Sequence, residues 1–328
     1  MADTIALVGG ETLLGRELVE VFGESALSAR VRLLAAEEDE TGKLTEIGGA
    51  PTLLSKLDPQ ELESASVIVL AGSKESSRQA MNARPTGVVI DLTGYLEDEV
   101  DAQLRSPLVE GDDYRPDPTG AHIVAHPAAT SVAVVLSRLN AAHPIARAIV
   151  HIFEPASERG KPGIDELQQQ TMNLFAFQQL PKKVFDAQAS FNMLARWGED
   201  APGSLLEVEE RIERHLASLL DRMEGVPMPS IRLLQAPVFH GYTFSFWVDF
   251  EESATTEEVE EALSGDRFDL RAGDVEAPSN VGVAGASAIA VGAITPDRNT
   301  ANAVWIWAAA DNLRIAAESA ALIATEVA

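Results

Sequence analysis

The sequence contains no cysteine among its 328 residues. This absence excludes disulfide bonds, thiolate metal sites and any reaction that proceeds through a thiol nucleophile. Basic side chains are also scarce, because 25 Lys and Arg stand against 51 Asp and Glu, which gives a formal net charge of −26. A charge of that sign repels nucleic acids and anionic membranes, so we expect neither as a partner.

Long hydrophobic runs are absent as well. The longest apolar run, Val281 to Ile294, is Gly-rich and spans 14 residues, which is too short to cross a bilayer. The first residues, Met1 to Thr4, include an acid and lead directly into a strand pattern, so we expect no signal peptide and a cytoplasmic location. No group of His, Asp and Glu has the spacing of metal ligands, and we predict no metal site.

The N-terminal part of the chain alternates short apolar strands with helical segments. This alternation predicts an α/β fold with a Rossmann-like, doubly wound parallel sheet. The expected strands are Thr4 to Val8, Val31 to Ala35, Val67 to Leu70, Val88 to Asp91 and Ala121 to Ala125, and the expected helices are Glu11 to Phe22 and Glu75 to Ala83.

The pattern then changes to alternating strands and longer helices, which predicts a second, α+β domain with a mixed or antiparallel sheet. We expect the first domain to comprise residues 1–130 and 311–328, and the second to comprise residues 131–310. The expected elements are strands Ala146 to Phe153, Ile231 to Ala236, Tyr242 to Phe250 and one starting at Val281, with helices Val132 to Leu139, Gly163 to Phe175, Leu205 to Met223, Thr256 to Leu263 and Asp311 to Val327.

A glycine-rich loop follows the first strand, where dinucleotide-binding proteins hold the pyrophosphate. Its spacing departs from G-x-G-x-x-G, and two interpretations stay open. Either the loop binds a dinucleotide, or the carboxylate of Glu11 satisfies the helix N–H groups itself and repels a phosphate. Glu37 and Glu38, after the second strand, stand where a carboxylate would hold a ribose 2′-hydroxyl, which favours NAD over NADP. The loop residues that would bind the cofactor are Gly9, Gly10, Thr12, Leu13, Leu14 and Gly15.

A proline corner, His126 to Ser131, stands between an apolar strand and a helix. Such corners point backbone N–H groups into a cleft and often carry a nucleophile. Here only small and hydroxyl side chains follow the proline. We interpret Thr130 and Ser131 as helix caps, since no base is assigned to them. A structural role and a catalytic role both stay open for His126.

Over nearly its whole length the chain resembles the aspartate-semialdehyde dehydrogenase family of amino-acid biosynthesis. That resemblance implies a nucleotide-binding domain, a dimerisation domain and a reaction in which a cysteine forms a thiohemiacetal, hydride passes to NADP, and phosphate attacks the thioester. The landmarks that match in order and spacing are Val8 to Gly15, Val88 to Asp91, Pro127, Ser157, Gly160-Lys161, Gly163 to Leu167, Phe191-Asn192, Pro237 to Phe239, Gly241 and Ala310 to Arg314.

The same resemblance identifies departures at the family's catalytic positions. The catalytic cysteine corresponds to Ala129, whose methyl group cannot form a covalent intermediate. The substrate-positioning glutamine corresponds to Glu154, the substrate-carboxylate arginine to Gln235, and the general-base histidine to Tyr242. Three further departures are Glu97 at the phosphate-side arginine, Glu158-Arg159 in a turn of small residues, and Arg211 near the position of a lysine.

Two functions are consistent with this sequence. The first is a non-catalytic homologue, a pseudoenzyme that acts as a binding or regulatory dimer with itself or with an active relative. In it the residues Ala129, Glu154, Gln235, Tyr242, Arg211 and His240 form a vestigial pocket. The second is an NAD-dependent oxidoreductase with altered, non-covalent chemistry on an aldehyde or oxo group. It would use Tyr242 as proton donor and Gly72 and Asn312 among its cofactor-binding residues. The sequence favours the first, with NAD, NADP or no cofactor bound and NAD preferred.

Overall fold

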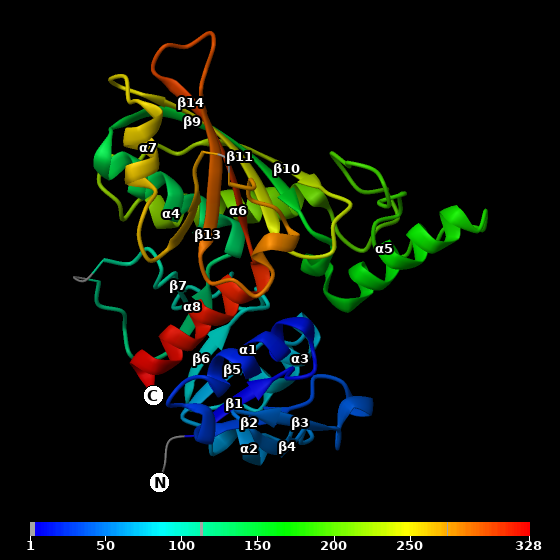
Figure 1. The fold of residues 1–328 in the computed structure, drawn as a ribbon. Coiled ribbons are helices and arrows are strands. Elements are labelled where there is room, and N and C mark those ends of the chain that lie inside the picture. Colours follow the sequence, from blue (N-terminus) through cyan, green and yellow to red (C-terminus); the bar gives the residue numbers. More distant parts are fainter. Residues whose placement is uncertain (1–3, 112–113, 274) are drawn as a thin grey trace. The chain divides into compact units, whose positions relative to one another are not determined.

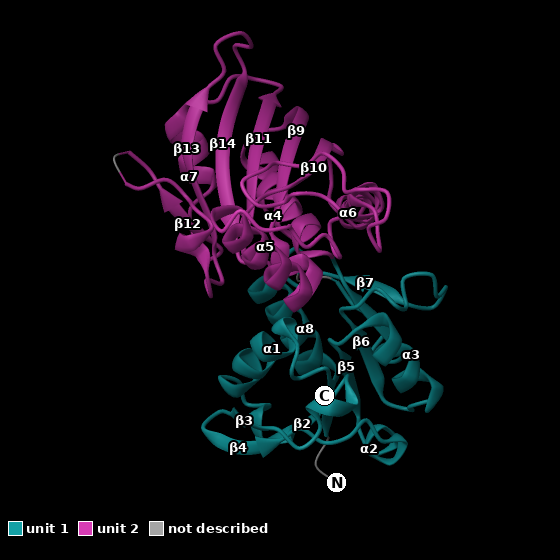
Figure 2. Ribbon diagram, turned by 90° about the vertical axis from the view of Figure 1, so that its right-hand side faces the viewer, with its two compact units in different colours: residues 1–125, 313–328 teal, residues 126–312 magenta. Residues whose placement is uncertain are grey.

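The chain divides into two compact units in the computed structural model, which describes residues 4–111, 114–273 and 275–328. Unit 1 comprises residues 1–125 and 313–328, and unit 2 comprises residues 126–312 (Figures 1 and 2). Within the described ranges, no helix is both long and apolar enough to cross a membrane.

Unit 1 is built on a six-stranded sheet in the order β2-β1-β5-β6-β8-β7, and every neighbouring pair in it is parallel. β1 and β5 are buried on both faces, as their continuous apolar sequences predict. The sheet strands are β1 (Ile5–Val8), β2 (Val31–Leu34), β5 (Val67–Leu70), β6 (Val88–Asp91), β7 (Gln103–Arg105) and β8 (Ala121–Val124), and a separate hairpin pairs β3 (Leu44–Ile47) with β4 (Ala50–Leu53).

Helices cover both faces of this sheet. Alternate side chains of β1 belong to different hydrophobic clusters, with Ile5 and Leu7 on one face and Ala6 and Val8 on the other. The first cluster includes residues of α1 (Leu13–Gly23) and α8 (Asn312–Val327), and the second includes residues of α2 (Pro59–Glu63) and α3 (Lys74–Asn82). The predicted doubly wound parallel sheet is therefore confirmed.

Unit 2 contains a second six-stranded sheet in the order β10-β9-β11-β14-β13-β12 (Figure 2). Its two edge pairs are parallel and its three central pairs are antiparallel, so the predicted mixed sheet is also confirmed. The strands are β9 (Ile145–Glu154), β10 (Ser230–Gln235), β11 (Tyr242–Phe250), β12 (Phe268–Arg271), β13 (Ile289–Pro296) and β14 (Ala303–Ala310).

The two faces of this second sheet differ. Alternate residues of β9 and β11, such as Val150, Phe244 and Phe246, are fully buried. Helix α4 packs against β9, α6 against β10 and α7 against β13, while α5 follows β9 in the chain. The opposite face carries more exposed side chains, including Trp305. The unit 2 helices are α4 (Pro127–Ala142), α5 (Gly160–Phe175), α6 (Leu205–Leu220) and α7 (Thr256–Ala262).

The prediction of a strand that starts at Val281 is wrong. Val281–Val283 form a short 3-10 helix, and the strand of this region, β13, starts only at Ile289. Gly285 has a φ of +71°, a left-handed conformation that interrupts an extended ladder. The apolar run is therefore a turn followed by a strand. Strand β14, which pairs with β13, was not predicted at all.

Candidate functional site

The proline corner of unit 2 is held by two histidines. His126 caps α4, since its Nδ1 accepts a hydrogen bond from the backbone N–H of Ala128 at 3.3 Å. The backbone N–H of His126 in turn donates to Nδ1 of His215 in α6 at 2.9 Å. His215 was missed from the sequence, because it lies 89 residues further along the chain and no local motif marks it.

The interpretation of Thr130 and Ser131 as helix caps is wrong. Proline tolerates the first helical position, so α4 already begins at Pro127, and both residues lie inside it. Ser131 Oγ donates to the carbonyl of Pro127 at 2.8 Å, and both side chains are buried. Neither hydroxyl is therefore placed as a nucleophile. Ala129, which the resemblance aligns with the cysteine, lies in the first turn of α4 with no exposed surface.

Glu154 is the most unusual group near this corner. It ends β9 with no exposed surface, and neither carboxylate oxygen has a hydrogen-bond partner among the described residues. Arg159 Nη2 lies 3.5 Å from Oε1, a longer separation than in a hydrogen-bonded ion pair. Burial raises the pKa of Glu154 to about 7, although Arg159 opposes the shift, and the charge of Glu158 adds to it. Glu154 is therefore partly protonated near neutral pH.

Glu158 and Arg159 belong to a network in the turn after β9. Asn312 Nδ2 donates to Glu158 Oε1 at 2.8 Å, and Asn312 Oδ1 accepts from Ser157 Oγ and from the backbone N–H of Gly241. The Arg159 guanidinium stacks on the ring of Trp197 at 5.0 Å. Burial raises the pKa of Glu158, against the effect of Arg159. The amide of Asn312, a predicted cofactor-binding residue, is used inside this network.

Tyr242 lies beside Glu154 and His126. Its ring centroid is 6.1 Å from that of His126, and its hydroxyl is buried with no hydrogen-bond partner among the described residues. Burial, together with Glu158 and Glu154, raises the pKa of Tyr242 well above its ordinary value. Burial also lowers the pKa of His126 well below its ordinary value, and Arg211 adds to that effect. Both side chains are therefore neutral at physiological pH.

Both the nitrogen and the oxygen of the Gln235 amide are already hydrogen-bonded. Its amide nitrogen donates to the backbone carbonyls of Glu154 at 2.9 Å and Ala236 at 3.3 Å, and its oxygen accepts from Trp197 Nε1 at 3.3 Å. The structure thus brings together five of the residues under discussion, His126, Glu154, Gln235, Tyr242 and Arg211. His240 is half-buried and has no hydrogen bond to this group among the described residues.

Hydrogen bonds of the Thr12 side chain fix the conformation of the glycine loop in unit 1. Thr12 caps α1 by accepting the N–H of Gly15 at 2.9 Å, and its hydroxyl contacts the carbonyls of Gly9 and Ala71 at 3.0 and 2.8 Å. Helix α1 starts at Leu13 with Thr12 as its cap, so the alternative in which Glu11 satisfies the helix N–H groups is wrong. The Glu11 carboxylate instead reaches the segment that follows β2.

Two glycines of this loop are required by close packing. A Cβ on Gly9 would lie 2.5 Å from the backbone of Gly72, and Gly9 has a φ of +92°. A Cβ on Gly15 would lie 1.9 Å from the Gly9 carbonyl. A Cβ on Gly10 would lie 3.3 Å from the Leu33 side chain, which can move to accept it. The loop therefore keeps its backbone path only with glycine at positions 9 and 15.

The two acids predicted to hold a ribose lie on the surface. Glu37 and Glu38 are both exposed beyond β2. Glu38 lies 3.3 Å from Lys56 Nζ, an ion pair between two exposed side chains. Their predicted contact with a ribose therefore depends on where a ligand lies, and it stays a prediction.

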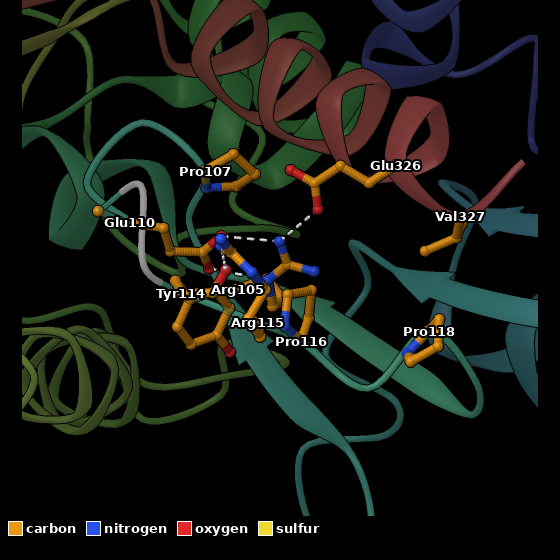
Figure 3. Close-up of a pocket in the computed structure, with 10 residues that line it drawn as sticks. Arg105, Pro107, Glu110, Tyr114, Arg115, Pro116, Pro118, Glu326 and Val327 are labelled. Carbon is orange, nitrogen blue, oxygen red and sulfur yellow. Dashed lines mark hydrogen bonds and ion pairs between the residues drawn. The ribbon is translucent and has the colours of Figure 1, made fainter.

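A separate hollow of about 460 Å³ lies in unit 1 beside the end of α8. Figure 3 shows Arg105 between Glu110 and Glu326. Arg105 Nε and Nη2 donate to Glu110 at 2.9 and 2.7 Å, and Nη2 also donates to Glu326 at 2.7 Å. Two carboxylates thus neutralise the buried guanidinium. We interpret this group as a structural ion-pair network that links β7 to α8. Across the described residues, no three His, Asp or Glu side chains are grouped as a metal ion requires.

Comparisons with known proteins agree with this architecture. Residues 136–315 match the family model described as "Semialdehyde dehydrogenase, dimerisation domain". The chain is 26% identical to aspartate-semialdehyde dehydrogenase of Rickettsia bellii, over 99% of this chain and 96% of that protein. It is 27% identical to a USG-1 protein homolog of Azotobacter vinelandii, over 95% and 94% of the two chains.

A solved structure gives the same result for the fold. The structure of a probable aspartate-semialdehyde dehydrogenase from Pseudomonas aeruginosa superposes with a TM-score of 0.85 at 25% identity, covering 100% of this chain and 98% of that one. Both units are included in that match. With a family model spanning more than half of its residues, this chain belongs to the semialdehyde dehydrogenase family.

Proposed function

We propose that this chain is a non-catalytic member of the semialdehyde dehydrogenase family that acts as a dimeric binding or regulatory protein. The observation that carries the proposal is Ala129, which the resemblance aligns with the family's nucleophile and which is buried in the first turn of α4. Its methyl group cannot attack a carbonyl carbon, and the neighbouring hydroxyls of Thr130 and Ser131 are buried inside the helix.

The substrate-binding positions support the same proposal. An arginine that bound a substrate carboxylate would be replaced by Gln235, whose amide is already bonded to the backbone and to Trp197. Fully buried Glu154 and half-buried Glu158 add carboxyl groups where an anionic substrate would need positive charge. Tyr242, which the resemblance aligns with the family's general base, has a raised pKa that keeps it protonated and therefore unable to accept a proton.

A second candidate function is favoured by the unsatisfied polar atoms of this group. The Tyr242 hydroxyl and the Glu154 carboxyl are buried without hydrogen-bond partners among the described residues. Such groups occur often at sites that transfer protons. In this alternative the chain reduces an aldehyde or oxo group, with hydride supplied by a reduced nicotinamide, and Tyr242 gives a proton to the carbonyl oxygen.

The open face of the unit 2 sheet is the surface we propose for dimerisation. On three adjacent strands the register aligns Ile149, Trp247 and Trp305, and Trp307 lies on the same face of β14. Ile149 and Trp305 are 41% and 37% exposed, which is unusual for such large apolar side chains. The matched dimerisation domain contains all four residues. A homodimer fits these observations, and pairing with an active relative is the alternative that mass analysis of purified complexes would identify.

Nucleotide binding is a further part of the proposal, and we expect NAD rather than NADP. The segment after β2 contains the acids Glu37, Glu38, Asp39 and Glu40. Lys56 and Lys43 are already paired with Glu38 and Glu40. Those acids would repel a 2′-phosphate at that position.

The decisive experiment is an assay of aspartate-semialdehyde oxidation with phosphate and either NAD or NADP. We expect no turnover above the rate without protein, because nucleophile, base and anion clamp are all replaced. The triple variant Ala129→Cys, Gln235→Arg, Tyr242→His should gain only a small rate, since Glu97 and Glu158 still oppose anions. Turnover by the unmodified chain would refute the non-catalytic proposal.

A parallel assay separates the two candidate functions. NADH-dependent reduction of a panel of small aldehydes should give no rate if the chain is non-catalytic. A rate that falls at least roughly a hundredfold in Tyr242→Phe would instead establish the oxidoreductase, because a general acid contributes about 10²–10⁴-fold. Phe244→Leu serves as the packing control, because the Phe244 ring contacts that of Tyr242 but carries no proton to donate.

A further inference from the structure

Glu11 makes an unexpected contact inside unit 1. From the third position of the glycine loop, its Oε1 accepts the backbone N–H groups of Ala36 at 2.7 Å and Glu37 at 3.2 Å. These two residues lie just beyond the end of β2. Consecutive backbone N–H groups that converge on one oxygen form an anion-binding concavity. In this chain that concavity is therefore filled by the chain's own carboxylate.

The second oxygen of the same carboxylate is left without a donor. Oε2 of Glu11 is buried and has no hydrogen-bond partner among the described residues. A buried carboxylate oxygen without a donor is costly, so such an atom is a position where a ligand hydroxyl gains a strong, charge-assisted hydrogen bond. Oε1 fixes the orientation of the carboxylate through two backbone N–H groups, so Oε2 can accept a ligand hydroxyl once the atoms that cover it move aside.

The position of this acceptor indicates which ligand group it would meet. In a doubly wound sheet, the adenosine ribose lies beside the glycine loop at the carboxyl end of β2. A ribose 2′-hydroxyl can donate a hydrogen bond to Oε2. A 2′-phosphate at neutral pH offers mainly acceptor oxygens and negative charge, and it would compete with Glu11 for the N–H groups of Ala36 and Glu37.

We infer that Glu11 is the receptor for the adenosine ribose 2′-hydroxyl and the residue that excludes a 2′-phosphate. This inference rests on the proposed nucleotide binding and deepens it, since it moves the selecting carboxylate from Glu37 to the glycine loop. Glu37 contributes its backbone N–H to the contact, while the residue itself is exposed.

The test is a calorimetric titration of the full chain with four nucleotides: NAD, NADP, AMP and adenosine 2′,5′-bisphosphate. We expect the 2′-hydroxyl ligand of each pair to bind at least roughly tenfold more tightly. Glu11→Ala frees both N–H groups and should reduce that preference roughly tenfold or more. The matched control is Glu46→Gln, which neutralises an exposed carboxylate of β3 elsewhere in unit 1 and should change the preference less than about twofold.

An independent readout does not depend on any ligand. In ¹⁵N-resolved NMR spectra, Glu11→Ala and Glu11→Gln should move the amide resonances of Ala36 and Glu37 far more than other amides of the sheet. Glu11→Gln keeps the side-chain size and so guards against a folding defect in the alanine variant.

Three results would overturn the inference. The first is equal affinity of the unmodified chain for both members of each pair, and the second is a preference that Glu11→Ala leaves unchanged. The third is no binding of any nucleotide by either protein. If the unmodified chain binds none but Glu11→Ala gains the 2′-phosphate ligands, the exclusion by Glu11 is supported. Catalytic turnover, which decides the proposed function, enters none of these outcomes.

Discussion

Two groups of buried polar side chains, one in each unit, differ in how their charges are paired. In unit 1, Arg105 has two carboxylate partners, and Arg314 lies within 3.5 Å of Glu17, Glu20, Glu24 and Glu318. Partial burial opposes the charge of Arg314, but Glu318 and Glu17 outweigh it and raise the pKa of this arginine. In unit 2, the group around Glu154 and Tyr242 contains a carboxyl and a hydroxyl that no donor or acceptor satisfies within the described residues.

This difference separates structural from functional polar groups. Folding selects paired charges, because an unpaired buried group costs about 1–3 kcal/mol. Unsatisfied groups that persist in a folded protein usually mark a site that was shaped by binding or catalysis. Glu11 Oε2, to which we assign a ligand, is such a group in unit 1.

His122 is a buried side chain whose lack of hydrogen-bond partners has a smaller energetic cost. Its two ring nitrogens also lie in unit 1 and have no hydrogen-bond partner in the described chain. Burial and Arg105 lower the pKa of His122, so the ring stays neutral. A neutral ring without partners costs far less than a charged one, and His122 therefore needs no ligand to explain it.

The largest expected effect tests the paired charges of unit 1. Arg105→Met leaves Glu110 buried without its cation and should destabilise the protein by about 3–5 kcal/mol. Hydrogen exchange of β7 and β8 should show the loss directly. Arg115→Met, at an exposed position of the following loop, is the control and should change stability by less than about 0.5 kcal/mol. Equal effects of both variants would remove the distinction between the two arginines.

A smaller change in stability, this time an increase, is expected from a substitution in unit 2. Glu154→Gln should stabilise the protein by roughly 1–3 kcal/mol at pH 8, because the ionised carboxylate of Glu154 is fully buried and its nearest cation, Arg159, lies 3.5 Å away. All four tryptophans of the chain, at positions 197, 247, 305 and 307, lie in unit 2, so their fluorescence during denaturation follows this unit.

The pH dependence of that variant gives a second check. The pKa of Glu154 is raised from 4.5 to about 7, so the folded state binds a proton that the unfolded state has already lost. The unmodified chain therefore loses stability relative to Glu154→Gln as pH rises from about 4.5 to 7, and the two should be similar at low pH.

The matched control for this second prediction is another buried carboxylate of unit 2. Glu166 accepts the backbone N–H groups of Lys183, Val184 and Phe185 at 2.6, 2.7 and 3.2 Å. Glu166→Gln should therefore destabilise the unit by about 1–3 kcal/mol at pH 8. If both glutamine variants shift stability in the same direction, the unsatisfied state of Glu154 is not what distinguishes it.

The smallest expected effect concerns the open sheet face. Asp297 Oδ2 accepts the indole N–H groups of Trp247 at 3.1 Å and Trp305 at 2.8 Å, which fixes both rings on that face. Asp297→Ala should raise the dimer dissociation constant roughly three- to tenfold, measured by sedimentation velocity. Glu252→Ala, an exposed residue outside the face, should leave the constant unchanged. An unmodified chain that sediments as a monomer would contradict the proposed dimer.

Most of the fold could be predicted from apolar periodicity. The strands Val67–Leu70, Val88–Asp91 and Tyr242–Phe250 have the bounds that the sequence indicated. Errors occurred where glycine conformation, rather than hydrophobicity, decided the path, as at Gly285 before β13. β14 was missed because its Ala- and Trp-rich sequence becomes a strand through pairing with β11 and β13, which no local pattern reveals.

For the candidate site, the sequence by itself determined which side chains are present. The absence of cysteine and the resemblance that aligns Ala129 with a nucleophile follow from residue identity, which needs no coordinates. Only the tertiary structure decided how those side chains are used. Glu11 caps no helix but reaches the N–H groups after β2, and His215 anchors a corner from another helix. Both contacts join segments distant in sequence, and hydrogen bonds of that kind depend on how the chain packs.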